Sequence, residues 1–212
     1  MTSGTNNVAL GQTGGQINSG SNNTCINGGG SVNTGSNNAF LGKDSGLSGS
    51  PGGAIATGSN EIVLGDENIS EAHIQVDWTV ASDERDKTDF TDLDIGLDFV
   101  KALEPITYKW DKRSKYGDKY DDDYDLNDQT PDGTHKEDWL DIGFKAQSVL
   151  ALEEAAGYSS DDKTNLTVSL SGDGKQYGLQ YSKFVPILVK AVQELSATVE
   201  TLKSEIELLK GE

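Results

Sequence analysis

Small apolar residues recur at a fixed phase along the first third of the chain, each time directly after a Gly/Ser/Thr-Asn turn. The four units are Gly4–Gly11, Gly20–Asn27, Gly35–Gly42 and Gly58–Gly65, and their starts lie 16, 15 and 23 residues apart. A turn followed by three or four small or apolar residues is how a solenoid closes one coil and begins the next. Because a flexible Gly/Ser linker has no reason to keep this phase, the pattern predicts β-rich repeats whose core is completed by neighbouring coils or neighbouring chains.

The pattern changes to mixed helix and strand periods in the second half. Residues 72–80 alternate as a strand would, and 94–103 carry apolar residues at helical spacing until Pro105 ends the helix. A strand is predicted at 106–110, and a second strand followed by a helix at 142–156. The predicted fold class is therefore α+β: a β-rich stalk of repeats followed by a mixed α/β domain that ends in a long helix.

A heptad pattern runs through the C-terminal residues 185–210. Steps of three and four separate the apolar residues Val185, Leu188, Val192, Leu195, Val199, Leu202, Ile206 and Leu209. This pattern predicts a coiled coil. With β-branched residues at the a positions and Leu at the d positions, isolated helices of this type favour a parallel dimer.

An acidic segment, residues 111–138, separates the two strand-and-helix units. It holds ten acidic and five basic residues with little apolar periodicity, which predicts an exposed arm. Four of its acidic residues have the spacing of a calcium loop, but Leu126 stands where that loop needs Gly. We therefore interpret the charges as solvated and expect neither a metal nor a cofactor, since His73 and His135 also lack partners at metal spacing.

Composition divides the chain near residue 80, because 16 of the 25 glycines fall within residues 1–81. We therefore expect two parts, 1–81 and 82–212. The formal net charge of -18 would repel nucleic acid and anionic lipid, and no stretch reaches the roughly 20 apolar residues of a membrane helix. The single cysteine, Cys25, excludes an internal disulfide and is expected to be a small buried side chain.

The junction between the two parts carries the candidate chemistry, in the run Ala81-Ser82-Asp83-Glu84-Arg85-Asp86-Lys87. Serine is a poor nucleophile without a base, and a lysine serves as one only where burial or a nearby cation favours its neutral form. A spacing of five places Ser82 and Lys87 on different faces of a helix or strand. They can meet only if the chain turns between them or if they come from different subunits. Taken alone, this run is most typical of a charged loop between a strand and a helix, because most Ser/Lys pairs are surface residues.

Several short motifs in fixed order resemble the peptidase S74 family, whose members are intramolecular chaperone domains of phage endosialidases, tail fibres and the myelin regulatory factor. The resemblance covers about 78–200 and rests on Ser82-Asp83-x-Arg85-x-Lys87, Gly96-Leu97-Asp98-Phe99, Tyr108-Lys109-Trp110, Gly143-Phe144-x-Ala146-Gln147 and Tyr181-Ser182-Lys183-x-Val185-Pro186. The repeats of residues 4–66 in turn resemble the left-handed β-roll repeats of trimeric adhesin heads and phage fibre shafts.

The resemblance implies a Ser-Lys dyad in which Ser82 is the nucleophile and Lys87 the general base. Arg85 would keep the lysine neutral or position the loop, or else form a surface ion pair with Asp83 or Asp89. Cleavage would fall at the junction Ala81, Ser82, Asp83. Attack of the serine oxygen on the Ala81 carbonyl closes a five-membered ring, whereas a cut after Ser82 would need a serine from another chain.

The resemblance also implies a function. The 82–212 part would align three chains through 185–210 and the stalk, assist folding, and then release itself by autoproteolysis, which makes a homotrimer the expected state despite the dimer preference of the heptads. The stalk would belong to a virion tail fibre or tailspike, with a host-surface receptor as a candidate partner, and the chaperone part would be freed in the host cytoplasm. The alternative is an uncleaved fibre-tip or receptor-binding module.

Overall fold

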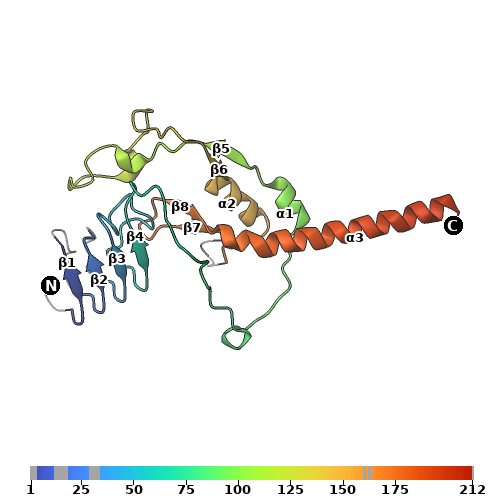
Figure 1. Ribbon diagram of the computed structural model, residues 1–212, viewed down its shortest axis with the longest axis horizontal. Coiled ribbons are helices and arrows are strands. Elements are labelled where there is room, and N and C mark those ends of the chain that lie inside the picture. The colour runs from blue at the N-terminus through green and yellow to red at the C-terminus, as the bar shows by residue number, and fades with distance from the viewer. Residues whose placement is uncertain (1–3, 12–18, 29–33, 160, 162–163, 212) are drawn as a thin grey trace. The chain divides into compact units, whose positions relative to one another are not determined.

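The computed structural model describes residues 4–11, 19–28, 34–159, 161 and 164–211. The chain forms two compact units, each built from separate stretches of sequence. Unit 1 comprises residues 1–72, 107–142 and 170–178, and unit 2 comprises residues 73–106, 143–169 and 179–212. Strands and helices are both present, and the long helix predicted at the C-terminus is formed (Figure 1), so the mixed α+β class is confirmed.

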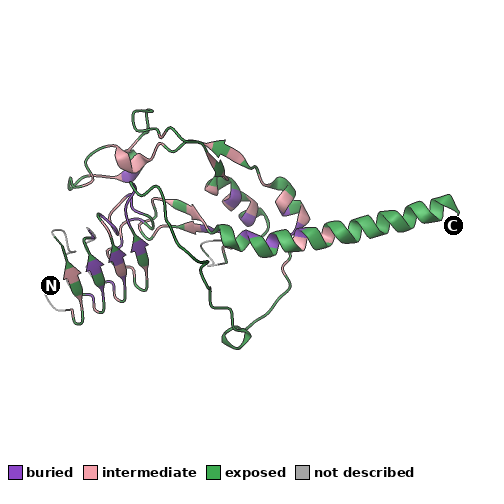
Figure 2. Ribbon diagram, in the orientation of Figure 1, coloured by how far each residue is buried: buried purple, intermediate pink, exposed green. Residues whose placement is uncertain are grey.

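The repeats of unit 1 form one parallel sheet with a single short strand from each repeat. The order is β1 (Val8–Leu10), β2 (Thr24–Ile26), β3 (Ala39–Leu41) and β4 (Ile62–Leu64). The strands pair in register, so the middle residues Ala9, Cys25, Phe40 and Val63 stand in one row. Cys25, Phe40 and Val63 are buried and pack with Ile55, while the residues that flank them on the strands are more exposed (Figure 2).

Two rows of asparagine explain why the turn motif recurs. The outer asparagines Asn6, Asn22, Asn37 and Asn60 all have positive φ angles, which Asn tolerates better than most residues. Each inner asparagine bonds its coil to the next one. Asn23, for example, donates from its side chain to the Gly35 carbonyl at 3.0 Å and accepts from the Asn38 backbone N–H at 3.0 Å. These bonds satisfy backbone groups that the short strands leave unpaired.

The glycines that open the first three units are required by close packing between coils. A Cβ atom on Gly20 would lie 1.9 Å from the Gly35 carbonyl oxygen, and one on Gly35 would lie 2.0 Å from that of Gly58. No side chain fits there, because real Cβ atoms do not approach a carbonyl so closely. The Gly-x-Asn-Asn motif is therefore a stacking motif as much as a turn motif.

The remaining strands of the fold form two small sheets. One pairs β5 (Ile106–Tyr108) with β6 (Asp141–Gly143), and the other pairs β7 (Val168–Leu170) with β8 (Tyr177–Leu179). The strand predicted at 106–110 and the strand and helix predicted at 142–156 are thus confirmed. The segment between β5 and β6 belongs to unit 1, and so does the segment between β7 and β8.

The helices of unit 2 surround one apolar core. They are α1 (Leu97–Ala102), α2 (Ala146–Ala155) and α3 (Phe184–Lys210). The core consists of the buried side chains Ile95, Phe99, Val149, Val168, Phe184 and Ile187. Glu194 on α3 fixes α1, since its carboxylate accepts a hydrogen bond from the Leu97 backbone N–H at 2.7 Å. Only the first turns of α3 are buried, and the rest of this 27-residue helix is exposed.

Glu153 on α2 is a buried carboxylate that the sequence pattern did not single out. It is 0% exposed and accepts hydrogen bonds from the Leu166 and Thr167 backbone N–H groups, at 3.0 and 2.7 Å, and from the Thr167 hydroxyl at 2.5 Å. These bonds join α2 to the residues that lead into β7. The carboxylate therefore replaces the backbone partners that this irregular stretch lacks.

We expect Glu153→Ala to lower the free energy of unfolding by about 3 kcal/mol, because two buried N–H groups and a hydroxyl lose their acceptor. Glu154→Ala on the next, exposed position is the matched control and should change it by less than about 0.5 kcal/mol. Urea unfolding followed by circular dichroism measures both. Equal effects of the two substitutions would show that the buried carboxylate contributes little.

Two expectations need correction. Residues 72–80 form no strand and join none of the sheets in the part of the chain that the structure describes. The 111–138 arm is not simply exposed, because Leu126 within it is 1% exposed and Lys119 forms buried ion pairs in unit 1. The sequence pattern did not indicate these buried residues, because most of the residues around them are charged. None of the described helices is both long enough and apolar enough to span a membrane.

Candidate functional site

The candidate site lies in a long exposed segment of unit 2, residues 73–92, in which every residue is exposed. Large apolar side chains occupy alternate positions just before Ser82: Ile74, Val76, Trp78 and Val80. Trp78 is 74% exposed and Val80 78%, which is unusual for four apolar side chains in one stretch. The sequence already showed this alternation of apolar residues, and these side chains are exposed in the single chain.

A tight turn brings Ser82 and Lys87 together. Asp83 accepts a hydrogen bond from the Arg85 backbone N–H at 3.0 Å and so caps the one-turn helix Glu84–Asp86. The chain then leaves this turn at Lys87, whose N–H donates to the Glu84 carbonyl at 3.1 Å. The Lys87 Nζ atom donates a hydrogen bond of 2.7 Å to Ser82 Oγ. Of the two arrangements left open by the spacing, a turn within one chain is the one the structure contains.

Arg85 forms its ion pair with Asp83 within this turn. The Arg85 Nε and guanidinium NH2 groups reach the two Asp83 oxygens at 3.0 and 2.6 Å. The Arg85 side chain, followed by its backbone N–H, lowers the pKa of the Asp83 carboxyl, and the same pair raises the pKa of Arg85. Arg85 thus holds the capping carboxylate ionised and in place, which stabilises the turn rather than contacting Lys87 directly.

The geometry permits nucleophilic chemistry under one condition. An amine within hydrogen-bond distance of a serine hydroxyl can take its proton if the amine is neutral, and removal from water favours the neutral form of any lysine. Ser82 and Lys87 are both exposed in the single chain. The turn therefore supplies the contact between the two groups, while the covering that activates such a pair is absent from one chain.

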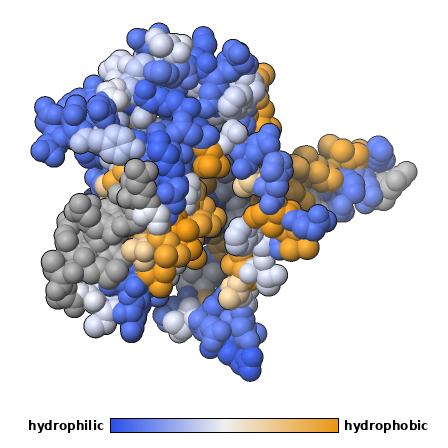
Figure 3. Space-filling model, turned by 60° about the vertical axis from the view of Figure 1, so that its left-hand side comes forward, coloured by the Kyte–Doolittle hydropathy of each residue, from blue (hydrophilic) through white to orange (hydrophobic). Residues whose placement is uncertain are grey.

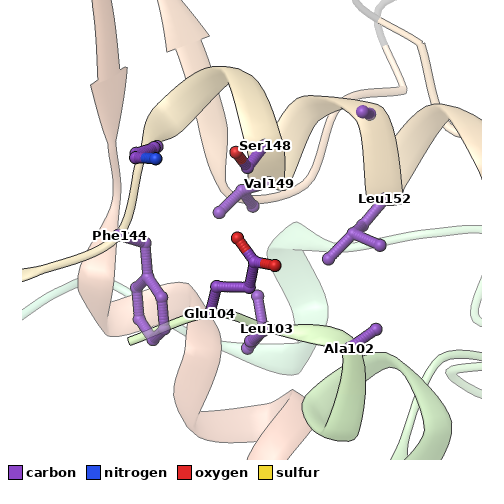
Figure 4. A pocket seen from close by; sticks show the side chains of 9 residues that line it. Ala102, Leu103, Glu104, Phe144, Ser148, Val149 and Leu152 are labelled. Atoms are coloured by element: carbon purple, nitrogen blue, oxygen red, sulfur yellow. The ribbon is translucent and has the colours of Figure 1, made fainter. Parts of the chain in front are cut away.

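A cavity of about 280 Å³ lies elsewhere in unit 2, between the end of α1 and α2 (Figure 4). Phe144, Val149 and Leu152 give it apolar walls, and the Glu104 side chain extends into it towards Ser148. Neither Ser82 nor Lys87 lines it. The cavity is therefore not part of the candidate dyad.

Two of the acidic residues with calcium-loop spacing have structural partners in unit 1. Asp125 and Asp132 each cap a turn, accepting from the backbone N–H of Asn127 at 2.8 Å and of Thr134 at 2.9 Å. His135 lies against the Tyr116 ring, with 4.8 Å between centroids. Among the residues that the structure describes, no three His, Cys, Asp or Glu side chains gather as a metal site would require.

Comparison with known proteins gives one match. Residues 82–158 match the family model of peptidase S74, described as chaperone of endosialidase. The matched region begins at Ser82 and includes the turn, α1 and α2. Searches of curated proteins and of solved structures found no match.

Proposed function

We propose that this chain, whose residues 82–158 match the peptidase S74 family model described as chaperone of endosialidase, assembles a phage tail fibre or tailspike and then cuts itself before Ser82. The part from Ser82 onward is the intramolecular chaperone, and residues 1–81 belong to the fibre stalk. The observation that carries the proposal is the 2.7 Å contact between Lys87 Nζ and Ser82 Oγ at the start of the matched region.

The proposed reaction begins when neutral Lys87 takes the proton of the Ser82 hydroxyl. The Ser82 oxygen attacks the Ala81 carbonyl carbon through a five-membered ring, and the bond from that carbon to the Ser82 nitrogen breaks. The nitrogen receives the proton from Lys87 and becomes a free amine, leaving an ester between Ala81 and the serine oxygen. Water then hydrolyses the ester, which yields an Ala81 carboxylate and restores the hydroxyl.

The proposed active form is a homotrimer. The heptad side chains of α3 are exposed in the single chain, and Figure 3 shows apolar groups along the projecting part of this helix. The outward strand residues of the repeats and the apolar positions of 74–80 are exposed as well. Uncovered apolar stripes on three successive parts of the chain favour self-association. Covering 74–80 would also withdraw the adjacent Ser82–Lys87 turn from water.

The direct test is a denaturing gel of the expressed protein followed by mass spectrometry of the bands. We expect two pieces, residues 1–81 and 82–212, with Ser82 as the new N-terminus. A C-terminal piece that starts at Asp83 would contradict attack on the Ala81 carbonyl. An intact chain under all conditions would favour the alternative function, an uncleaved fibre-tip or receptor-binding module.

A further inference from the structure

Unit 1 contains chain from both sides of Ser82. Residues 1–72 lie on the N-terminal side of the proposed cut, whereas residues 107–142 and 170–178 lie on its C-terminal side. A cut before Ser82 therefore divides the covalent chain without dividing this compact unit. Whether the two pieces separate depends on the contacts between them inside unit 1.

The longest repeat contributes several of the contacts between the two sides of the chain. Phe40 and Val63 are paired on neighbouring strands although 23 residues apart, and the intervening residues include a series of turns. At Gly49 in this stretch, an added Cβ would lie 2.4 Å from the Ser114 Cβ. The irregular spacing seen in the sequence thus marks a coil whose added residues touch the C-terminal side of the chain.

A buried network of one lysine and two carboxylates forms the centre of this contact. Lys119 Nζ lies 2.9 Å from Asp44 Oδ2 and 2.8 Å from Glu67 Oε1. The side chains of Lys119, Asp44 and Glu67 are only 11%, 1% and 7% exposed. Burial acts against the charge on Asp44, yet the Lys119 and Tyr120 hydrogen bonds lower its pKa overall. Removing the ammonium would leave two carboxylates buried without their partner, which is strongly unfavourable.

Two further hydrogen bonds are made by the same two acidic residues, Asp44 and Glu67. The Tyr120 hydroxyl donates to Asp44 Oδ2 at 2.7 Å, and Lys112 Nζ donates to the Glu67 carbonyl at 2.8 Å. A separate contact lies at Asp173, whose Oδ2 accepts from the Ala54 backbone N–H at 2.8 Å. All of these bonds join residues before Ser82 to residues after it, and those to ionised groups are the stronger kind of hydrogen bond.

We propose that these contacts keep the two cleavage products bound to each other, so that cutting and release are separate events. The inference rests on the proposed cleavage, and its partner is the chain's own second product. The principal contact is made by Lys119 of the C-terminal product, which forms ion pairs with Asp44 and Glu67 of the N-terminal product. Because salt screens buried pairs far less than exposed ones, physiological salt leaves the products associated.

Size-exclusion chromatography at 0.15 M NaCl, with a denaturing gel of each fraction, tests this on the cleaved protein. We expect the two pieces to elute together in the wild type and apart in Lys119→Met. Lys136→Met removes an exposed charge from the same arm and should leave them together. Wild-type pieces that elute apart would overturn the proposal, as would Lys119→Met pieces that elute together.

Two additions keep the test decisive. Tyr120→Phe deletes one hydroxyl, so it spares the fold and should speed dissociation of the pieces by about tenfold; an unchanged rate would contradict a role for the Asp44 cluster. In Ser82→Ala, a recognition site for a sequence-specific protease within the exposed residues 88–92 makes a cut without the dyad. Co-elution after that cut supports the retained contact even if autoproteolysis fails, and separation overturns it.

Discussion

Ser82→Ala and Lys87→Ala are each expected to leave the chain uncut while it still assembles. Ser82→Ala removes the only oxygen that can attack through the five-membered ring, so no product should form. Lys87→Ala removes the base 2.7 Å away and should slow cutting by about 10² to 10⁴-fold. Both side chains are exposed, so neither substitution should change the free energy of unfolding by more than about 0.5 kcal/mol.

The matched controls are Ser70→Ala and Lys101→Ala, which alter exposed residues of the same types. A time course on denaturing gels gives the rate of cutting, and light scattering gives the assembly state. Cutting of Lys87→Ala at the wild-type rate would remove the lysine from the reaction. Loss of assembly in Ser82→Ala would show instead that the turn has a structural role.

The double substitution Leu195→Asp with Leu202→Asp is expected to abolish both assembly and cutting. Both positions are d positions of the exposed heptad stripe on α3. Burying an unpaired carboxylate in an apolar seam costs several kcal/mol, and each chain would contribute two. Without assembly the Ser82–Lys87 turn stays in water, so we expect cutting to fall with it.

Ala197→Asp with Ser204→Asp is the matched control for this pair. It introduces the same two charges, seven residues apart on the same helix, at exposed positions outside the heptad stripe. This control should assemble and cut normally. If the Leu195/Leu202 variant is a monomer that still cuts at the wild-type rate, the turn works within one chain and cutting is no checkpoint on assembly.

The sequence was most informative where structure follows from neighbours along the chain. The repeat phase predicted the buried position of Cys25 and one strand per repeat, and helical spacing before Pro105 predicted α1. The strand expected at 72–80 was wrong for the opposite reason. Alternating apolar residues make a strand only where another segment pairs with them, and the sheets formed by the described residues include no strand from 72–80.

Buried charges were the main features that the sequence could not predict. Lys119 and Asp44 are 75 residues apart, and Glu153 is buried on a helix whose next residue, Glu154, is exposed. Nothing local distinguishes such side chains from the solvated charges around them. The Ser82–Lys87 contact could be predicted only in part. The spacing required either a turn or a second subunit, and it did not decide between them.

The asparagine rows give the repeats of unit 1 a fixed end. The side-chain N–H₂ group of each inner Asn donates a hydrogen bond to the next coil. The fourth unit has Glu61 at the equivalent position, and its side chain lies next to Gly58. A carboxylate has no N–H to give, so the series stops there whatever number of coils precedes it. Whole units can therefore be added or removed before the fourth unit without changing how the series ends.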